Sequence, residues 1–276
     1  MKNLVTAVWL HKHLKDENLV ILDTSLPVTA EGIKTNTDEK TIPNARYFDL
    51  KGCFSDKNGL YPNTLPKPEQ FELECRKLGI HNQSKIVVFD SLGIYSSPRV
   101  WWMFKVMGHR AVAVLGGGLP EWKHKGFHVE NRKIATWEMG EFSASFKKKF
   151  LISYKEVLHN IDAQNFTIVD ARSPGRFNGT EEEPRKHLKS GSIPNSVNIP
   201  HQEVLHNGNY KTKLELEALF ENVCDKDATL VFSCGSGITA CIVMLASQLA
   251  FNKSKRIYDG SWTEWAELQN LRDGVI

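Results

Sequence analysis

Short runs of apolar residues recur along the chain and are separated by longer stretches in which apolar and polar residues mix. The runs LVILD at 19–23 and KIVVFD at 85–90 are typical of strands buried on both faces of a sheet. The stretches near 68–78 and 96–108 are typical of helices. Strands that alternate with helices predict an α/β fold, with a mainly parallel sheet and helices on both of its faces.

The second half of the chain repeats this pattern. The runs FTIVD at 166–170 and ATLVFS at 228–233 are followed by predicted helices near 212–222 and 237–250. Leu22-Asp23-Thr24 matches Val169-Asp170-Ala171, 147 residues further on, and Thr6 and Ser153 each stand where they can cap a helix. The repeat predicts two tandem domains, over residues 1–135 and 150–276, with an exposed linker at 136–149.

Composition narrows the class of protein. Of 276 residues, 35 are Lys or Arg and 32 are Asp or Glu, so the net charge of +3 does not favour nucleic acid as a partner. The five cysteines are an odd number without regular spacing, which argues against a secreted domain built on disulfides. No apolar run reaches the ~18 residues that a membrane span needs. The N-terminal stretch is interrupted by His11, Lys12 and Asp16, which predicts a cytoplasmic protein that lacks a targeting segment.

The loop after ATLVFS carries the main candidate for chemistry. It reads CGSGITAC and places Cys234 between a buried strand and the start of a helix. Two glycines let successive N–H groups point inward, and the helix dipole lies behind them, so the loop favours an anion and a thiolate at Cys234. Cys241 falls inside the following helix, and we expect it, together with Cys53, Cys75 and Cys224, to be structural.

The equivalent loop of the first half begins at Ser91 and has no cysteine, which predicts a non-catalytic copy. A second candidate feature is a pair of arginines, Arg176 and Arg185, in the stretch that follows FTIVD. A guanidinium suits a carboxylate substrate, but both arginines can equally pair with Glu181, Glu182 or Glu183 at the surface.

Taken together, these motifs resemble the two-domain 3-mercaptopyruvate sulfurtransferases of the rhodanese superfamily. The resemblance rests on the four stretches Val169 to Arg185, SIPNSVNIP at 192–200, Val231 to Cys241 and Tyr258 to Trp265, and on Ser96 to Trp122 in the first half. It implies two rhodanese-like domains, no cofactor and no metal. It also implies a small-molecule sulfur donor, 3-mercaptopyruvate, and a thiol, a thioredoxin-like protein or cyanide as acceptor.

The resemblance also implies roles for individual residues. Cys234 becomes a persulfide, Arg176 and Arg185 bind the carboxylate and keto oxygens of the donor, and Ser236 and Asp49 help with proton handling. We expect the rest of the loop to contact the substrate through Gly235, Gly237, Ile238 and Thr239. The family commonly has a histidine where this chain has Asn63, which can hydrogen-bond substrate but cannot transfer a proton at neutral pH.

Three other functions fit parts of this pattern. A thiosulfate sulfurtransferase shares the mechanism, but thiosulfate enzymes of the superfamily carry cationic side chains after the cysteine, and this loop has no Lys or Arg from 234 to 241. A cysteine phosphatase needs an arginine six residues after the cysteine, where this chain has Ala240. A non-catalytic binding module fits the first half alone. We therefore expect sulfur transfer from mercaptopyruvate.

Overall fold

The chain forms two compact units. The computed structural model describes residues 1–29, 32, 34–35, 40–133, 135–223, 229–251 and 254–272, so the prediction for Cys224 lies outside the described residues. The first unit consists of Met1–Asn58, Leu65–Lys147 and Asn207–Tyr210, and the second of Gly59–Thr64, Lys148–His206 and Lys211–Ile276. Each unit therefore includes one short segment from the other half of the sequence, which the repeat does not predict. The boundaries at 135 and 150 remain a prediction.

The described part of the first unit contains a five-stranded sheet in the order β1-β6-β5-β2-β4, with every neighbouring pair parallel. Its strands are β1 Leu4–Val5, β2 Leu19–Asp23, β4 Arg46–Tyr47, β5 Lys85–Phe89 and β6 Val112–Leu115. Its helices are α1 Ala7–His13, α2 Pro68–Lys77, α3 Ser97–Val106 and α4 Gly118–His124. A short antiparallel pair joins β3 Lys40–Thr41 to β7 Glu130–Asn131.

The second unit repeats this order. Its sheet, within the described residues, is β8-β14-β13-β9-β10, again with parallel pairs throughout. The strands are β8 Leu151–Ile152, β9 Thr167–Asp170, β10 Ser196–Asn198, β13 Leu230–Ser233 and β14 Lys255–Tyr258. The helices are α5 Tyr154–Ala163, α6 Pro174–Asn178, α7 Lys213–Glu221, α8 Ala240–Ala250 and α9 Ser261–Arg272. The shorter elements are η1 Lys148–Phe150, η2 His201–Val204 and β11 Leu205–His206. The strand β12 Asn209–Tyr210 lies in the short segment that belongs to the first unit. The predicted α/β fold with parallel sheets is confirmed.

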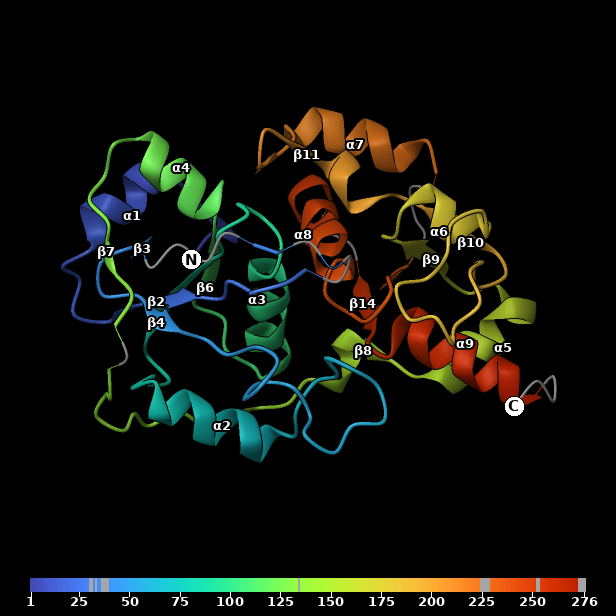
Figure 1. Ribbon diagram of the computed structural model, residues 1–276, viewed down its shortest axis with the longest axis horizontal. Coiled ribbons are helices and arrows are strands. Elements are labelled where there is room, and N and C mark those ends of the chain that lie inside the picture. The colour runs from blue at the N-terminus through green and yellow to red at the C-terminus, as the bar shows by residue number, and fades with distance from the viewer. Residues whose placement is uncertain are drawn as a thin grey trace. The chain divides into compact units, whose positions relative to one another are not determined.

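Helices cover both faces of the first sheet (Figure 1). Val87 and Phe89 of β5 pack in one cluster with Leu10 of α1 and Trp122 of α4. Because side chains alternate along a strand, Ile86 and Val88 point to the opposite face, where α2 and α3 lie. The central strands β2, β5 and β6 are buried on both sides, which is why their sequences are continuous apolar runs rather than alternating ones.

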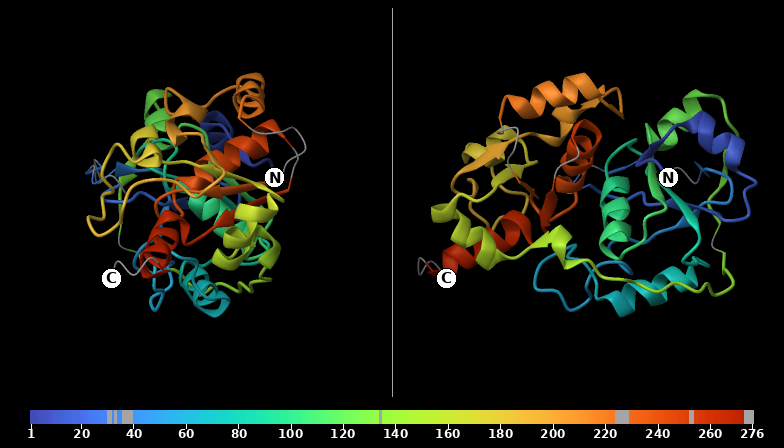
Figure 2. Two further views of the ribbon diagram at one scale, coloured as in Figure 1. Left: turned by 90° about the vertical axis from the view of Figure 1, so that its right-hand side faces the viewer. Right: turned by 180° about the vertical axis from the view of Figure 1, so that it is seen from behind.

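The second sheet is covered in the same way, with α5 and α9 on one face and α7 and α8 on the other (Figures 1 and 2). Val231 of β13 packs with Val157 of α5 and Trp265 of α9. Helix α8 is buried along nearly its whole length, so the loop that precedes it is fixed at both ends.

The predicted helix caps are confirmed. The Thr6 hydroxyl accepts a hydrogen bond from the Trp9 N–H at 3.1 Å. Ser153 forms a complete capping box with Glu156, in which each side chain accepts from the other residue's backbone N–H. Such caps contribute about 1 kcal/mol each. No helix among the described residues is long and apolar enough to cross a membrane.

Candidate active site

Cys234 is the first residue after β13, a strand flanked by β9 and β14 in the second sheet. The loop continues through Thr239, and α8 begins at Ala240. Ligand sites of parallel sheets lie beyond the carboxyl ends of the strands, which is where this loop stands. Cys234 is only 2% exposed.

The loop curls around the sulfur. The Gly237 N–H donates to the Cys234 Sγ at 3.1 Å. Gly237 has φ +80°, a conformation that L side chains rarely adopt, so glycine permits the turn that aims this N–H at the sulfur. The thiol of Cys241 donates to the Gly237 carbonyl at 3.5 Å and is fully buried, which agrees with a structural role.

The start of α9 holds the backbone of Cys234 from the other side. The Cys234 N–H donates to the Ser261 hydroxyl at 3.2 Å, and the Cys234 carbonyl accepts from the Trp262 N–H at 2.9 Å. Ser261 itself has φ +53° and donates its hydroxyl to the Tyr258 carbonyl at 2.8 Å. The position of the nucleophile candidate is therefore set by a helix that the sequence pattern did not predict.

Ser236 and Asn63 are brought together, although 173 residues separate them in the chain. The Asn63 Nδ2 donates to the Ser236 Oγ at 2.9 Å, within the second unit. Asn63 has φ +62°, a left-handed conformation that asparagine tolerates better than most residues. Ser236 Oγ is thus the acceptor in this contact.

Arg176 lies beside the loop, and its guanidinium is bound on one edge by Glu183. The Nε and Nη2 atoms donate to the two carboxylate oxygens of Glu183 at 3.1 and 2.7 Å. The guanidinium also lies close to Gly235, because a Cβ added there would stand 2.7 Å from Arg176 Nη2. One of the alternative pairings is thus present for Arg176, but in a buried position rather than at the surface.

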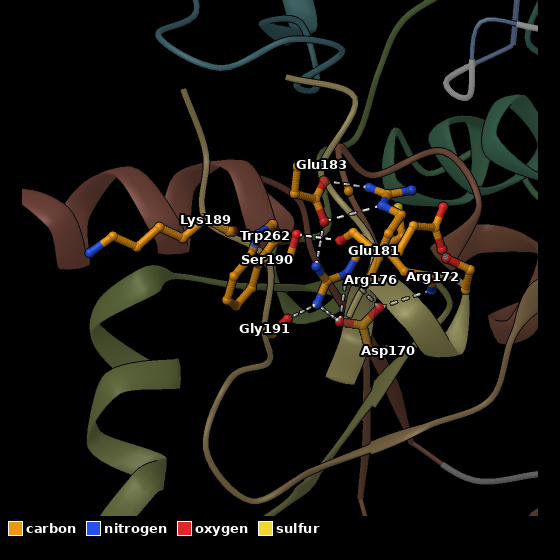
Figure 3. A network of polar contacts seen from close by, with 12 residues as sticks. Asp170, Arg172, Arg176, Glu181, Glu183, Lys189, Ser190, Gly191 and Trp262 are labelled. Carbon is orange, nitrogen blue, oxygen red and sulfur yellow. Dashed lines mark hydrogen bonds and ion pairs between the residues drawn. The ribbon is translucent and has the colours of Figure 1, made fainter. Parts of the chain in front are cut away.

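A further arginine, Arg172, joins the same network and was not singled out from the sequence (Figure 3). It is fully buried, forms ion pairs with Asp170 and Glu183 at 2.7 Å each, and donates to the Gly191 carbonyl at 2.6 Å. Its guanidinium lies over the Trp262 ring, 4.3 Å from the centroid. Two carboxylates and two guanidiniums balance in charge, which is what allows the group to be buried.

Arg185 is half-buried and makes a different contact. Its Nη1 donates to the Thr263 hydroxyl at 3.2 Å. Burial lowers the pKa of Arg185, while the negative charge of Glu183 acts in the opposite direction. Ile238 and Thr239 are buried in the loop itself, next to Gly237.

Asp49 belongs to the first unit, where its carboxylate accepts the Gly52 N–H at 2.9 Å and caps a turn. The Cys53 thiol lies 3.8 Å from the same carboxylate, and burial, followed by the charge of Asp49, raises the pKa of Cys53. Cys75 is fully buried, and burial raises its pKa well above the ordinary value. Both observations fit structural cysteines. No group of three or more His, Cys, Asp or Glu residues is placed to hold a metal in the described part of the chain.

The equivalent loop of the first unit already contains an anion. The Asp90 carboxylate accepts the N–H groups of Leu92, Tyr95 and Ser97 at 2.9–3.0 Å, and the Ser97 hydroxyl at 2.6 Å. In the second unit the residue at the position of Asp90 is Ser233, and the Gly237 N–H of the loop donates to the Cys234 sulfur instead of to a carboxylate. This difference supports a non-catalytic role for the first unit.

Known proteins resemble the chain along almost its whole length. A family model of the rhodanese-like domain matches residues 6–125 and 153–268. Mouse 3-mercaptopyruvate sulfurtransferase is 39% identical over 272 residues, covering 95% of this chain and 91% of that protein. Rat thiosulfate sulfurtransferase is 37% identical over 273 residues, with the same coverage of 95% and 91%. The crystal structure of Escherichia coli SseA, a 3-mercaptopyruvate sulfotransferase, matches with a TM-score of 0.85 at 32% identity, covering 95% of this chain and 99% of that one.

The chain therefore belongs to the rhodanese-like family, with two such domains in tandem. Within that family its similarity is to the two-domain sulfurtransferases, which confirms the assignment made from the sequence motifs. Relatives that act on mercaptopyruvate and on thiosulfate differ by only two percentage points in identity, so the donor must be argued from the site.

Proposed function

We propose that this protein is a 3-mercaptopyruvate sulfurtransferase that carries sulfur as a persulfide on Cys234. The observation that carries the proposal is the hydrogen bond from the Gly237 N–H to the Cys234 Sγ, at the end of β13 and ahead of α8. The Gly237 N–H dipole aimed at this sulfur stabilises the thiolate that attacks and the thiolate that is released later. The family assignment supports the same chemistry.

In the first half-reaction the Cys234 thiolate attacks the donor sulfur. A new S–S bond forms, the C–S bond of mercaptopyruvate breaks, and the three-carbon fragment leaves as the enolate of pyruvate. The enolate then takes up a proton to give pyruvate. That proton comes from solvent and is taken up at the carbon that lost the sulfur, while the Ser236 hydroxyl, whose Oγ accepts from the Asn63 amide, donates a hydrogen bond to the enolate oxygen and keeps its own proton.

The arginines bind the carboxylate end of the donor. Arg176 is held in place by its two hydrogen bonds to Glu183, and its Nη2 lies next to Gly235, so its positive charge stands beside the loop. Arg185 donates to a neutral hydroxyl, so that contact does not cancel its charge. The loop residues Gly235, Ile238 and Thr239 complete the proposed site of the second unit, and the role of Asp49 in proton handling stays what the family resemblance implies.

In the second half-reaction an acceptor removes the outer sulfur and restores the Cys234 thiolate. A small thiol, a thioredoxin-like protein or cyanide can each attack this sulfur. Because Cys234 is only 2% exposed, the acceptor has to reach into the loop rather than react at the protein surface. A cytoplasmic location and the domain boundaries at 135 and 150 belong to the same proposal.

The charge of the loop favours mercaptopyruvate over thiosulfate. Thiosulfate is a compact dianion, whereas residues 234 to 241 contain no Lys or Arg. The loop offers amides and the Ser236 hydroxyl, which suit a single developing charge on an enolate oxygen. A thiosulfate:cyanide sulfurtransferase remains the alternative that the test below addresses.

The test is to incubate the protein with mercaptopyruvate in the absence of an acceptor. We expect a mass gain of one sulfur on the peptide that contains Cys234. Cys234→Ser should show no gain, whereas Cys241→Ser, which keeps a donor for the Gly237 carbonyl, should behave as the wild type. A persulfide elsewhere overturns the assignment of the nucleophile. A kcat/KM for thiosulfate equal to or above that for mercaptopyruvate, with one common acceptor, overturns the choice of donor.

A further inference from the structure

Thr263, in the first turn of α9, connects an arginine of the site to the backbone beside Cys234. Its hydroxyl donates to the Gly235 carbonyl at 2.7 Å, and its N–H donates to the same carbonyl at 3.2 Å. The same hydroxyl accepts from the Arg185 Nη1 at 3.2 Å. A single side chain therefore connects Arg185 to the residue that follows Cys234.

The polarity of this connection is fixed. A hydroxyl has one hydrogen, and here it is used on the Gly235 carbonyl, which leaves the oxygen lone pairs to accept from Arg185. Thr263 is only 1% exposed, so bulk water has little access to replace the hydroxyl if it is removed. The arrangement holds the guanidinium in one place relative to the loop.

The two arginines of the site differ in how their charge is compensated. Arg176 donates to both oxygens of the buried Glu183 carboxylate. Arg185 donates instead to the neutral oxygen of Thr263, so its orientation is fixed without its charge being cancelled by that partner. A cation held in this way next to the nucleophile selects for an anion.

We infer that Thr263 is a positioning residue that orients Arg185 beside the Cys234–Gly235 turn and thereby sets the preference of the site for an anionic sulfur donor. The inference rests on the proposed function insofar as that donor is mercaptopyruvate. It goes beyond that function because it assigns selectivity for anions to a residue outside both the cysteine loop and the arginine-bearing segment.

The experiment compares how fast Cys234 is alkylated by iodoacetate and by iodoacetamide, two reagents of similar size that differ in charge. We expect Thr263→Val to lower the iodoacetate-to-iodoacetamide rate ratio by roughly three- to ten-fold, which corresponds to one hydrogen bond of ordinary strength. The iodoacetamide rate should stay unchanged. Thr263→Ser, which keeps the hydroxyl, should retain the wild-type ratio, and Thr263→Ala is a second variant without it.

A matched control is Thr24→Val in the first unit, where a buried threonine hydroxyl also donates to a backbone carbonyl, that of Phe89, at 2.9 Å. It should leave the ratio unchanged. The double variant Thr263→Val with Arg185→Ala should have the ratio of Arg185→Ala alone, because Thr263 acts through that arginine.

An unchanged ratio in Thr263→Val, or a Thr263 effect that persists without Arg185, overturns the inference. The kcat/KM for mercaptopyruvate should fall with the ratio, mainly through KM. If no persulfide forms from mercaptopyruvate but the alkylation ratio still depends on Thr263, the proposed function fails while the positioning role stands.

Discussion

Glu183 binds Arg176 with both carboxylate oxygens, at 3.1 and 2.7 Å, and neither side chain is more than a few per cent exposed. One of these oxygens also accepts from Arg172 at 2.7 Å. A single buried carboxylate thus orients both Arg172 and Arg176, the latter of which we propose binds the substrate. Removing this carboxylate should affect both the stability of the protein and its binding of substrate.

Glu183→Gln should destabilise the second unit by about 3–5 kcal/mol, because two buried guanidiniums lose a shared counter-charge. The measurement is the midpoint of urea or thermal unfolding. Glu182→Gln, a change of the same kind at the exposed neighbouring residue, is the control and should leave the midpoint within experimental error. Equal midpoints for the wild type and Glu183→Gln would contradict the role given to this carboxylate.

Arg176→Ala and Arg185→Ala should each lower kcat/KM for mercaptopyruvate by roughly 10- to 100-fold, the value of one charge-assisted contact. They should differ in stability. Arg176→Ala removes a buried ion pair, whereas Arg185 is half-buried and hydrogen-bonded to a neutral hydroxyl. The unfolding midpoint of Arg185→Ala should therefore lie closer to that of the wild type than the midpoint of Arg176→Ala does. Unchanged kinetics in both variants would assign the two arginines to structure alone.

Ser236→Lys should shift donor preference towards thiosulfate, since the added charge favours the more anionic donor. Gly235 is less suitable for this change, because any Cβ there stands 2.7 Å from Arg176 Nη2 and displaces that guanidinium. The measurement is the ratio of kcat/KM for thiosulfate to that for mercaptopyruvate. Ser236→Ala serves as the control for loss of the hydroxyl, and a ratio in Ser236→Lys no higher than in this control would argue against a role for loop charge.

Asn63→His should introduce a new titration, at about pH 6–7, into the pH profile of kcat/KM. The Asn63 amide reaches the Ser236 hydroxyl at 2.9 Å and does not titrate in this range, so any change in the profile reports the new imidazole. Asn44→His is the backbone-matched control, because Asn44 also has φ +62°. Identical profiles for the wild type and Asn63→His would mean that this position does not influence proton handling.

His109 should make the protein less stable in mild acid. Burial lowers the pKa of His109, so the folded state binds this proton less readily than the unfolded state does. The stability contributed by the neutral ring is therefore fully present above the unfolded pKa of about 6.5, and it is lost as pH falls from that value through the lower pKa of the folded state. Between pH 7.5 and 5, the urea midpoint of unfolding should decrease less in His109→Gln than in the wild type. His124→Gln, at an exposed histidine, is the control and should show the same decrease as the wild type.

The sequence by itself determined the parts that depend on local pattern. Continuous apolar runs predict strands buried on both faces, and β2, β5, β9 and β13 formed where those runs lie. The placement of Cys234 after β13 and before a helix follows from the same reasoning, because strand, glycines and helix start are adjacent in the chain. Elements without a period of their own were missed, including the two-residue strands β1 and β8 and the helices α4 and α9.

Only the tertiary structure decided which side chains meet. Three consecutive glutamates follow Arg176 in the sequence, and the fold buries Glu183 against it while Glu181 and Glu182 remain exposed. The contact between Asn63 and Ser236 spans 173 residues, which no local pattern encodes. Thr263 reaches Gly235 because parallel strands bring the ends of β13 and β14 to the same edge of the sheet, and that proximity arises from strand order rather than from sequence separation.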